Sequence, residues 1–277
     1  HNRRVIWLTR RYGKDCVCNA HGWHREPNAR ERPAPLSRIT VQIDLPDLKI
    51  NKSLEVRLMD CNIASAAIME RPNMTTDLIS ERRGQTMWVT FNRPEARNAM
   101  TFGMYEELAR ICKGVSGDRS VRAMIILGAG GKAFAAGTDM SQFRAFETPQ
   151  DALDYEVEIN RVLTAVEQCP VPTVAAIHGA CTGGGASIAA ACDIRIASQP
   201  LKFGFPIART LGNCLNAANL ARLTELLGAG RVREMIFTAR LMGADEALAC
   251  GLISEILSDD ATLLKRAEAL AAHSAGL

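Results

Sequence analysis

From Met74 onward, apolar positions recur in short runs with the period of a strand and in longer runs with the period of a helix. Leu78–Glu81 and Met87–Phe91 flank Arg83–Gly84–Gln85 and predict a hairpin. Further strands are predicted at Ala123–Leu127, Thr173–Ile177, Ile194–Ala197 and Leu201–Phe203. Helices are predicted at Thr101–Lys113, Asp151–Glu167, Gly184–Cys192, Asn216–Leu227, Arg231–Thr238, Ala244–Cys250 and Ala261–Ala272. Strands that alternate with helices indicate parallel βαβ units and therefore an α/β fold.

The first 73 residues differ from the rest, because only short stretches such as Ile39–Leu45 alternate like a strand. They carry 13 Lys+Arg against 8 Asp+Glu, and these acidic residues argue against a transit peptide. We expect residues 1–73 to be a mostly disordered upstream extension, or the product of a wrongly assigned start, before a domain at 74–277. The cluster Cys16, Cys18, His21 and His24 has spacings that fit zinc ligands poorly, so no metal site is predicted.

Charge and cysteine content narrow the functional classes. Residues 74–277 carry 20 Lys+Arg against 22 Asp+Glu, so this part has no excess of positive charge with which to bind nucleic acid. The nine cysteines follow no regular pattern, which favours reduced thiols and a cytoplasmic location. The uncharged stretch Cys169–Cys192 is interrupted by two prolines and the triple glycine Gly183–Gly185, so a buried strand–turn–helix is expected there instead of a membrane span.

Two segments carry the chemistry of the chain: Lys132–Met140 (KAFAAGTDM) and His178–Gly185 (HGACTGGG). In each, an apolar strand ends in a turn of small residues that opens into a helix, an arrangement that aims backbone N–H groups at an anionic oxygen. In this order and with these flanks, the two segments resemble the enoyl-CoA hydratase/isomerase (crotonase) family. The resemblance implies a spiral of ββα units with C-terminal helices, an acyl-CoA thioester as substrate, and a homotrimer or dimer of trimers. It implies no separate cofactor, because coenzyme A is part of the substrate.

The resemblance also assigns roles to individual residues. It places an oxyanion hole for a thioester enolate on the backbone N–H groups of Thr138 and Gly184, with Ala136 and Gly183 beside the substrate. Asp139 belongs to the same segment, and we expect it to act as a structural cap and not as a base. Ala96 and Arg97 fall in a stretch that resembles the coenzyme A lining, and Arg97 and Lys132 are expected beside its phosphates. Asp193 and Arg195 are expected to be structural.

The sequence departs from the hydratase pattern at two positions. Hydratases of the family carry one glutamate two positions after the glycine triplet and a second after a Phe-Gly-x-Pro element; Ser187 and Ile207 stand there. Serine can hold a water molecule but is a poor base without a partner, and isoleucine cannot transfer a proton. Glu147, Glu156 and Glu158 are alternative proton-transfer groups, but a solvated helix face is the better interpretation of them. Arg209, Asn213 and Cys214 follow Pro206 in the loop expected to face the pocket, and Cys214 would need His178 to act as a nucleophile.

Three functions therefore remain open at this stage. The chain is an enoyl-CoA hydratase, a relative that uses the same hole for isomerisation, decarboxylation or hydrolysis with a different base, or a module that binds acyl-CoA without turnover. The resemblance covers residues 78–277, and relatives continue beyond the position of Leu277, so a shortened C-terminal region is expected.

Overall fold

The computed structural model describes residues 17–19, 22–24, 38–45, 50–57, 76–210, 212 and 214–276. Its contacts divide the chain into two compact units, His1–Glu70 and Arg71–Leu277. In the first unit, β1 (Val17–Asn19) pairs antiparallel with β2 (Gly22–His24), and β3 (Arg38–Leu45) pairs antiparallel with β4 (Ile50–Arg57). β3 agrees with the strand predicted at Ile39–Leu45. The expected disorder of residues 1–73 stays a prediction, since much of that segment, including Cys16 and His21, lies outside the described residues.

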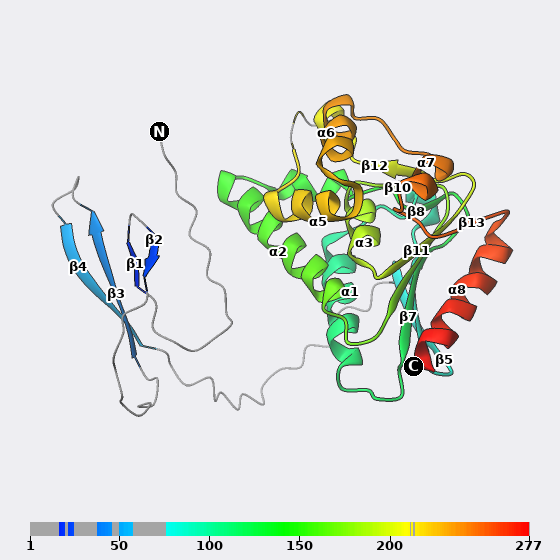
Figure 1. Cartoon of the computed structure of the whole chain (residues 1–277), viewed down its shortest axis with the longest axis horizontal. Coiled ribbons are helices and arrows are strands. Elements are labelled where there is room, and N and C mark those ends of the chain that lie inside the picture. The colour runs from blue at the N-terminus through cyan, green and yellow to red at the C-terminus, as the bar shows by residue number, and fades with distance from the viewer. Residues whose placement is uncertain are drawn as a thin grey trace. The chain divides into compact units, whose positions relative to one another are not determined.

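The second unit repeats a pattern of two strands and a helix (Figure 1). The successive groups are β5 (Leu78–Arg83), β6 (Thr86–Phe91) and α1 (Phe102–Val115); β7 (Ala123–Gly128), β8 (Ala133–Ala135) and α2 (Pro149–Glu167); β9 (Thr173–Ile177), β10 (Ala180–Thr182) and α3 (Gly184–Ala191); and β11 (Ile194–Ser198), β12 (Lys202–Gly204) and α4 (Ile207–Thr210). They are followed by α5 (Ala217–Leu227), α6 (Ala229–Thr238), α7 (Ala244–Ala249), β13 (Ile256–Leu257) and α8 (Asp260–Ala275). Short 3-10 turns lie at η1 (Pro94–Ala96) and η2 (Met140–Ala145). The expected ββα architecture of an α/β fold is confirmed.

Two sheets organise this unit. The larger has the strand order β13–β11–β9–β7–β6–β5 and is parallel except for the β5–β6 hairpin. The smaller has the order β12–β10–β8 and is parallel throughout. In each of the last three ββα groups the first strand therefore enters the large sheet and the second enters the small one. This brings the carboxyl ends of β8, β10 and β12 to a common edge.

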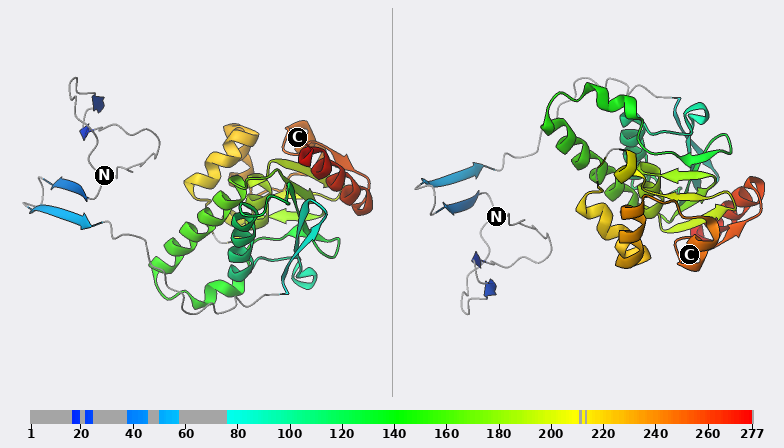
Figure 2. Two further views of the ribbon diagram at one scale, coloured as in Figure 1. Left: turned by 90° about the horizontal axis from the view of Figure 1, so that it is seen from below. Right: turned by 90° about the horizontal axis from the view of Figure 1, so that it is seen from above.

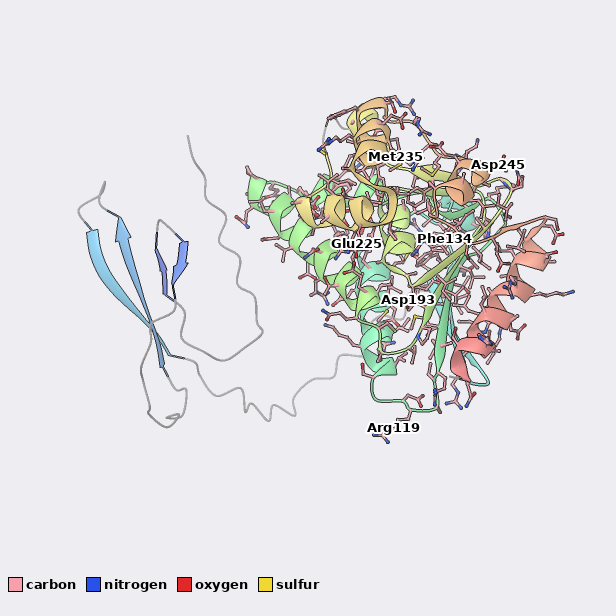
Figure 3. The ribbon with its side chains drawn as sticks, viewed as in Figure 1. Arg119, Phe134, Asp193, Glu225, Met235 and Asp245 are labelled. Atoms are coloured by element: carbon pink, nitrogen blue, oxygen red, sulfur yellow. The ribbon has the colours of Figure 1, made fainter. Side chains whose placement is uncertain are left out.

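The large sheet is buried on both faces. Ile125, Val174 and Ile196 pack with Leu263 and the alanines of α8 on one face. The intervening strand residues, such as Met124 and Ile126, belong to the main core, which includes side chains from α1, α2 and α3. In both views of Figure 2, α8 (red) and α2 (green) lie on opposite sides of the strands. Phe134, labelled in Figure 3, is fully buried between these layers. Alternation along each strand thus supplies two apolar faces, as parallel sheets require.

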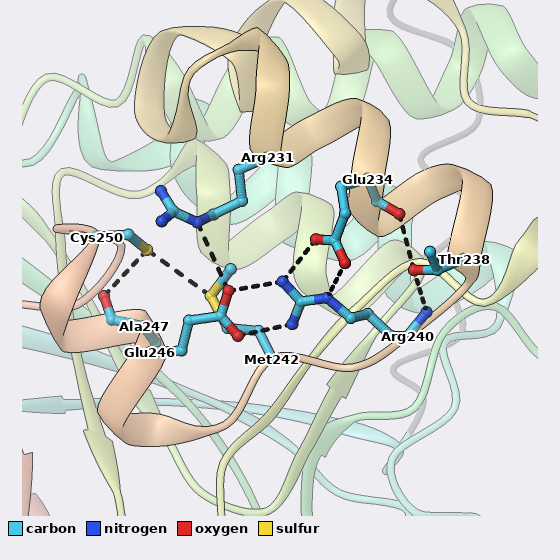
Figure 4. A network of polar contacts seen from close by, with 8 residues as sticks. All are labelled: Arg231, Glu234, Thr238, Arg240, Met242, Glu246, Ala247 and Cys250. Carbon is cyan, nitrogen blue, oxygen red and sulfur yellow. Dashed lines mark hydrogen bonds and ion pairs between the residues drawn. The ribbon is translucent and has the colours of Figure 1, made fainter.

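A network of ion pairs joins α6 to α7 beside β12, whose Phe203 pairs with Met242 (Figure 4). The Arg240 guanidinium donates to the carboxylates of Glu234 at 2.5 and 2.6 Å and of Glu246 at 2.6 and 2.7 Å. Arg231 lies 3.6 Å from Glu246. A hollow of about 400 Å³ next to this network is lined by the same four charged residues. Since each of these charges already has a partner of opposite sign, we interpret the network as structural.

Most predicted elements are observed with ends shifted by a few residues. The hairpin is confirmed, with β5 and β6 paired from Leu78↔Phe91 to Arg83↔Thr86. The predicted strand at Leu201–Phe203 appears as β12, and the predicted helix at Ala261–Ala272 extends to Ala275. The sequence did not predict β8, β10 or α4, which have only three or four residues each. Among the described residues, no helix combines the length and the apolar composition that crossing a membrane requires.

Candidate active site

The small sheet brings the two predicted signature segments together. β8 and β10 run parallel, with Ala133 opposite Ala180 and Ala135 opposite Cys181. The chain leaves β8 through Gly137–Thr138 and leaves β10 through Gly183–Gly184. Because carboxyl ends of neighbouring parallel strands lie at the same edge of a sheet, the two turns are neighbours. β12 lies on the other side of β10, so the segment that starts α4 at Ile207 belongs to this edge as well.

The first turn keeps the N–H of Thr138 out of the sheet. Met100 donates its N–H to the carbonyl of Gly137 at 2.8 Å, and its carbonyl accepts the N–H of Asp139 at 2.9 Å. In this parallel bridge the N–H of Thr138 points away from Met100. No acceptor for it is found among the residues that the structure describes. Gly137 has φ 101°, a backbone conformation that favours glycine.

The side chain of Asn98 anchors the loop that leads into β8. Its side chain is fully buried, donates to the carbonyls of Ala129 at 2.9 Å and Ala133 at 2.7 Å, and accepts from the N–H of Arg93 at 2.9 Å. Asn98 itself has φ 56°, in the left-handed region that asparagine tolerates better than most residues. The amide therefore ties the loop before β8 to the segment that precedes α1.

The second turn presents the start of a helix. Gly183 has φ 52° and precedes α3, whose first residue is Gly184. The N–H of Gly183 donates to Gly204 of β12 at 3.0 Å, which anchors the turn to the small sheet. The N–H of Gly184 is one of the first-turn donors that have no partner inside a helix, and none is found for it in the described part of the chain. The positive end of the helix dipole lies at the same place.

The two turns touch each other. A Cβ atom built onto Gly183 would lie 3.4 Å from Cα of Gly137, and one built onto Gly184 would lie 3.3 Å from Oγ1 of Thr138. Two backbone donors, for which the described residues provide no acceptor, thus lie on neighbouring turns at one edge. Such a pair can stabilise negative charge that develops on a carbonyl oxygen.

A chain of three hydroxyl groups lies at the same place, and no sequence pattern predicted it. Oγ1 of Thr138 is 2.9 Å from the hydroxyl of Tyr105 on α1 and 2.8 Å from the hydroxyl of Tyr155 on α2. Tyr105 is buried, and burial raises its pKa well above the usual value. Burial raises the pKa of Tyr155 to about 12, an effect that its bond to Thr138 opposes. Helical periodicity could have indicated that Tyr105 faces inward, but nothing in the sequence shows that both phenols reach one threonine.

Aromatic rings surround the Tyr155 side chain. Its ring lies 4.9 Å from that of Phe143, 5.4 Å from that of Phe102 and 6.2 Å from that of Phe146, measured between centroids. These side chains come from the start of α1, from η2 and from the segment before α2. They form an apolar wall beside the hydroxyl chain.

The positions expected of the hydratase glutamates are Ser187 and Ile207. Ser187 is buried on α3, and its N–H bonds the carbonyl of Gly183 at 3.0 Å. Ile207 is half-buried at the start of α4 and packs against the main core. Neither side chain can act as a carboxylate base, so the edge that carries the two backbone donors has no carboxylate at these two positions.

The residues expected to bind coenzyme A lie near the two opposite ends of β8. Ala96 is half-buried and ends η1, and Arg97 is exposed, with its carbonyl accepting the N–H of Ala136 at 3.0 Å. This bond places Arg97 beside the first turn. Lys132 is exposed and precedes β8, at the opposite end of that short strand.

Asp139 has the structural contacts of a cap. One carboxylate oxygen accepts the N–H and hydroxyl of Ser141 at 3.0 and 2.7 Å, and the other accepts from Arg93 at 2.9 Å. Hydrogen bonds from Ser141, followed by the contact with Arg93, lower the pKa of Asp139. The expected structural roles of Asp193 and Arg195 also agree with their contacts: Asp193 accepts from Thr173, and Arg195 donates to backbone carbonyls, including that of Leu252.

The other candidate acids, bases and nucleophiles differ in their exposure and contacts. Glu147 is exposed, Glu158 pairs with Arg161 at 2.7 Å, and Glu156 accepts from the Asn216 amide at 2.6 Å. Arg209 and Cys214 are exposed, and Asn213 lies outside the described residues. His178 is buried and burial lowers its pKa; its Nε2 atom has no partner among the described residues. No group of three or more metal-ligating side chains is found in the described part of the chain.

Comparison with known proteins gives a consistent result. A family model described as enoyl-CoA hydratase/isomerase matches residues 81–276. The short-chain-enoyl-CoA hydratase of Clostridium acetobutylicum is 36% identical over 181 residues, which span 65% of this chain and 69% of that protein. The mitochondrial Delta(3,5)-Delta(2,4)-dienoyl-CoA isomerase of Rattus norvegicus is 34% identical over 239 residues, spanning 81% of this chain and 72% of that protein.

Solved structures agree with these sequence matches. The crystal structure of an enoyl-CoA hydratase/carnithine racemase from Magnetospirillum magneticum superposes with a TM-score of 0.68 at 35% identity, covering 72% of this chain and 74% of the other. An enoyl-CoA hydratase from Bacillus anthracis gives the same TM-score at 30% identity, covering 73% and 77%. The family model, the relatives and the fold together show that this chain belongs to the enoyl-CoA hydratase/isomerase family.

Proposed function

We propose that this chain binds acyl-CoA thioesters and stabilises the enolate form of the thioester with the backbone N–H groups of Thr138 and Gly184. The observation that carries the proposal is the contact between the two turns that follow β8 and β10, which places both donors side by side. Fixed dipoles of this kind need no reorganisation when negative charge develops on the thioester oxygen. Coenzyme A is part of the substrate, and the proposed chemistry uses no further cofactor.

A binding titration and an activity assay with crotonyl-CoA test the proposal. Gly184→Pro removes one donor and should abolish turnover or weaken binding strongly. Gly184→Ala is the matched control, since it also places a Cβ atom against Tyr105 but retains the backbone N–H. If the folded wild-type chain neither binds nor converts the thioester, the proposal is wrong.

Two reactions are candidates at this site. The relatives include proteins named as hydratases, so hydration of a 2-enoyl-CoA is the first. Isomerisation of the acyl double bond is the second, and Ser187 and Ile207 favour it because water addition lacks its two expected carboxylates. A relative is named as a dienoyl-CoA isomerase. Binding of crotonyl-CoA without conversion to either product would identify the third function, a non-catalytic acyl-CoA module.

The assembly and location of the chain remain part of the proposal. Exposed apolar side chains support an interface between copies: Leu153 and Val157 lie one turn apart on α2 with 59% and 66% exposure, and Phe237 on α6 is 82% exposed. We expect a homotrimer or a dimer of trimers, which light scattering after size-exclusion chromatography would establish. The burial of Cys112 and Cys192 suits reduced thiols and therefore a cytoplasmic location.

A further inference from the structure

The site lacks the expected glutamates, but it contains a phenol one hydrogen bond from Thr138. The hydroxyl of Tyr155 lies 2.8 Å from Oγ1 of Thr138, the residue whose N–H is proposed to hold the thioester oxygen. In an enolate, the carbon that must gain a proton is bonded to the carbon that carries this oxygen. A donor within one hydrogen bond of Thr138 is therefore in the region where the proton is needed.

The direction of the hydroxyl chain can be assigned from burial. Tyr105 is only 3% exposed, and its hydroxyl has Thr138 as its partner. A buried O–H that donates to nothing is costly, so we assign the Tyr105 proton to Thr138. A threonine hydroxyl has a single proton to donate, and we assign it to its other partner, Tyr155. In this order Tyr105 and Thr138 each donate one hydrogen bond within the chain, and the O–H of Tyr155 remains available to donate to a bound substrate.

Tyr155 is also the more open end of the chain. It is half-buried, whereas Tyr105 is buried, and its ring packs against the wall of Phe102, Phe143 and Phe146. An acyl group lying along this wall would meet the phenol at its edge. The three rings fix the orientation of Tyr155 without offering an acceptor that competes for its proton.

We propose that Tyr155 is a catalytic residue that transfers a proton to and from the α-carbon of the bound acyl thioester, with Thr138 and Tyr105 as positioning residues. This inference rests on the proposed function, since it requires that the thioester binds at Thr138 and Gly184. In the forward step the O–H bond of Tyr155 breaks and a C–H bond forms at the α-carbon. The electron pair of the enolate double bond forms this C–H bond, the thioester C=O is restored, and the phenolate recovers a proton from water.

Two titratable groups act on the phenol. Tyr105 faces it across Thr138, and Glu156 follows it on α2, where the carboxylate raises the pKa of Tyr155 by electrostatic repulsion. Glu156 is held by the Asn216 amide at 2.6 Å and has no part in the hydroxyl chain. Glu156→Gln is therefore the control that tests whether this carboxylate, and not the phenol, transfers the proton.

The test is exchange of the α-hydrogens of butyryl-CoA in D₂O, followed by mass spectrometry, with a parallel titration of butyryl-CoA binding. Tyr155→Phe retains the ring and should slow exchange by about 10²-fold or more at an unchanged Kd. Exchange by the wild-type chain should rise with pH as the phenolate fraction rises, and the variant should lose this dependence. Thr138→Val breaks the chain and should slow exchange, and Thr138→Ser should restore most of it.

The outcomes separate this inference from the proposed function. If butyryl-CoA does not bind to the wild-type chain, the proposed function fails and the inference fails with it. If it binds but shows no exchange, or if Tyr155→Phe exchanges at the wild-type rate, only the inference is overturned. Loss of exchange in Glu156→Gln alone would assign the proton to the carboxylate.

A second measurement covers the case in which Tyr155→Phe does not fold. The chain has three tyrosines, and their biosynthetic replacement by 3-fluorotyrosine lowers the pKa of each phenol without removing it. The pH profile of exchange should then shift to lower pH. An unshifted profile contradicts the inference.

Discussion

The hydroxyl of Tyr105 occupies the place where a side chain at Gly184 would begin. A Cβ atom built onto Gly184 would lie 1.8 Å from this oxygen and 3.1 Å from Cζ of the same ring. Glycine at this position also leaves the backbone open to close approach by a thioester. The structure provides an additional reason, because a buried phenol on α1 already fills the space.

The first prediction follows from this overlap. Gly184→Ala should destabilise the fold by about 1–3 kcal/mol and displace Tyr105, because the methyl group has no room. Tyr105→Phe removes the oxygen at 1.8 Å and should recover part of the loss in the double variant. Gly230→Ala on α6 is the control, since a Cβ there meets nothing within 4 Å. Thermal unfolding of the four variants measures the effect, and equal stability of Gly184→Ala and wild type would contradict the overlap.

The second prediction concerns the reaction. Wild-type hydration of crotonyl-CoA should be slow, because Ser187 and Ile207 replace both expected carboxylates. Ser187→Glu with Ile207→Glu should raise hydration, and each well-placed acid or base contributes about 10²–10⁴-fold. The control Ser187→Gln with Ile207→Gln has nearly the same shape without the charge. Folding is checked alongside, because Ser187 is buried and a carboxylate there carries a desolvation cost.

One result for the wild-type chain would overturn the second prediction. A kcat/KM near the diffusional ceiling of about 10⁸ M⁻¹s⁻¹ would mean that another group supplies the missing acid–base function.

The third prediction tests the support of the loop before β8. Asn98→Ala removes the hydrogen bonds to the carbonyls of Ala129 and Ala133 and from the N–H of Arg93, and it places alanine at φ 56°. We expect a loss of at least about 2 kcal/mol in the free energy of unfolding, measured by urea denaturation. Asn92→Ala removes a single exposed bond, to the carbonyl of Thr76, and should change stability by less than about 1 kcal/mol. Equal effects of the two substitutions would show that Asn98 does not hold this loop.

The fourth prediction is a dependence on alkaline pH. An unfolded tyrosine titrates at about pH 10, whereas burial raises the pKa of Tyr155 to about 12. Since the folded value is the higher one, the contribution of Tyr155 to stability is complete below the unfolded pKa and is lost as the pH rises through the folded pKa. The free energy of unfolding should therefore fall between these two pH values, and Tyr155→Phe should reduce the fall. Ultraviolet absorbance of phenolate in the folded chain, compared between wild type and Tyr155→Phe, checks the assignment.

Long apolar runs made much of the fold predictable. β7 and β9 are recognisable because every residue in them is apolar or small, and α2 is recognisable because Leu163 and Val166 share a face with earlier apolar positions. β8 and β10 were not predicted, because three residues are too few to show the alternation of a strand. Their pairing nevertheless decides where the signature turns meet, so the resemblance to a family supplied what the local pattern could not.

The candidate site was only partly predictable, for a related reason. Glycines at positive φ, such as Gly137 and Gly183, mark turns that a sequence motif records directly. The contacts of Tyr105 and Tyr155 with Thr138 join positions that are 33 and 17 residues away from it along the chain. A helical period indicates which face of α1 is buried, but it does not identify the side chain that this face meets.

The proposed donors at Thr138 and Gly184 belong to the backbone, and this affects how such a chain tolerates mutation. Of the twenty standard amino acids, only proline removes a main-chain N–H, so other substitutions leave the donor itself in the chain, although at Gly184 they also displace Tyr105. The groups at positions 187 and 207 are side chains and change with any substitution. Drift at those two positions can therefore change the acid–base groups of the site while both backbone donors persist.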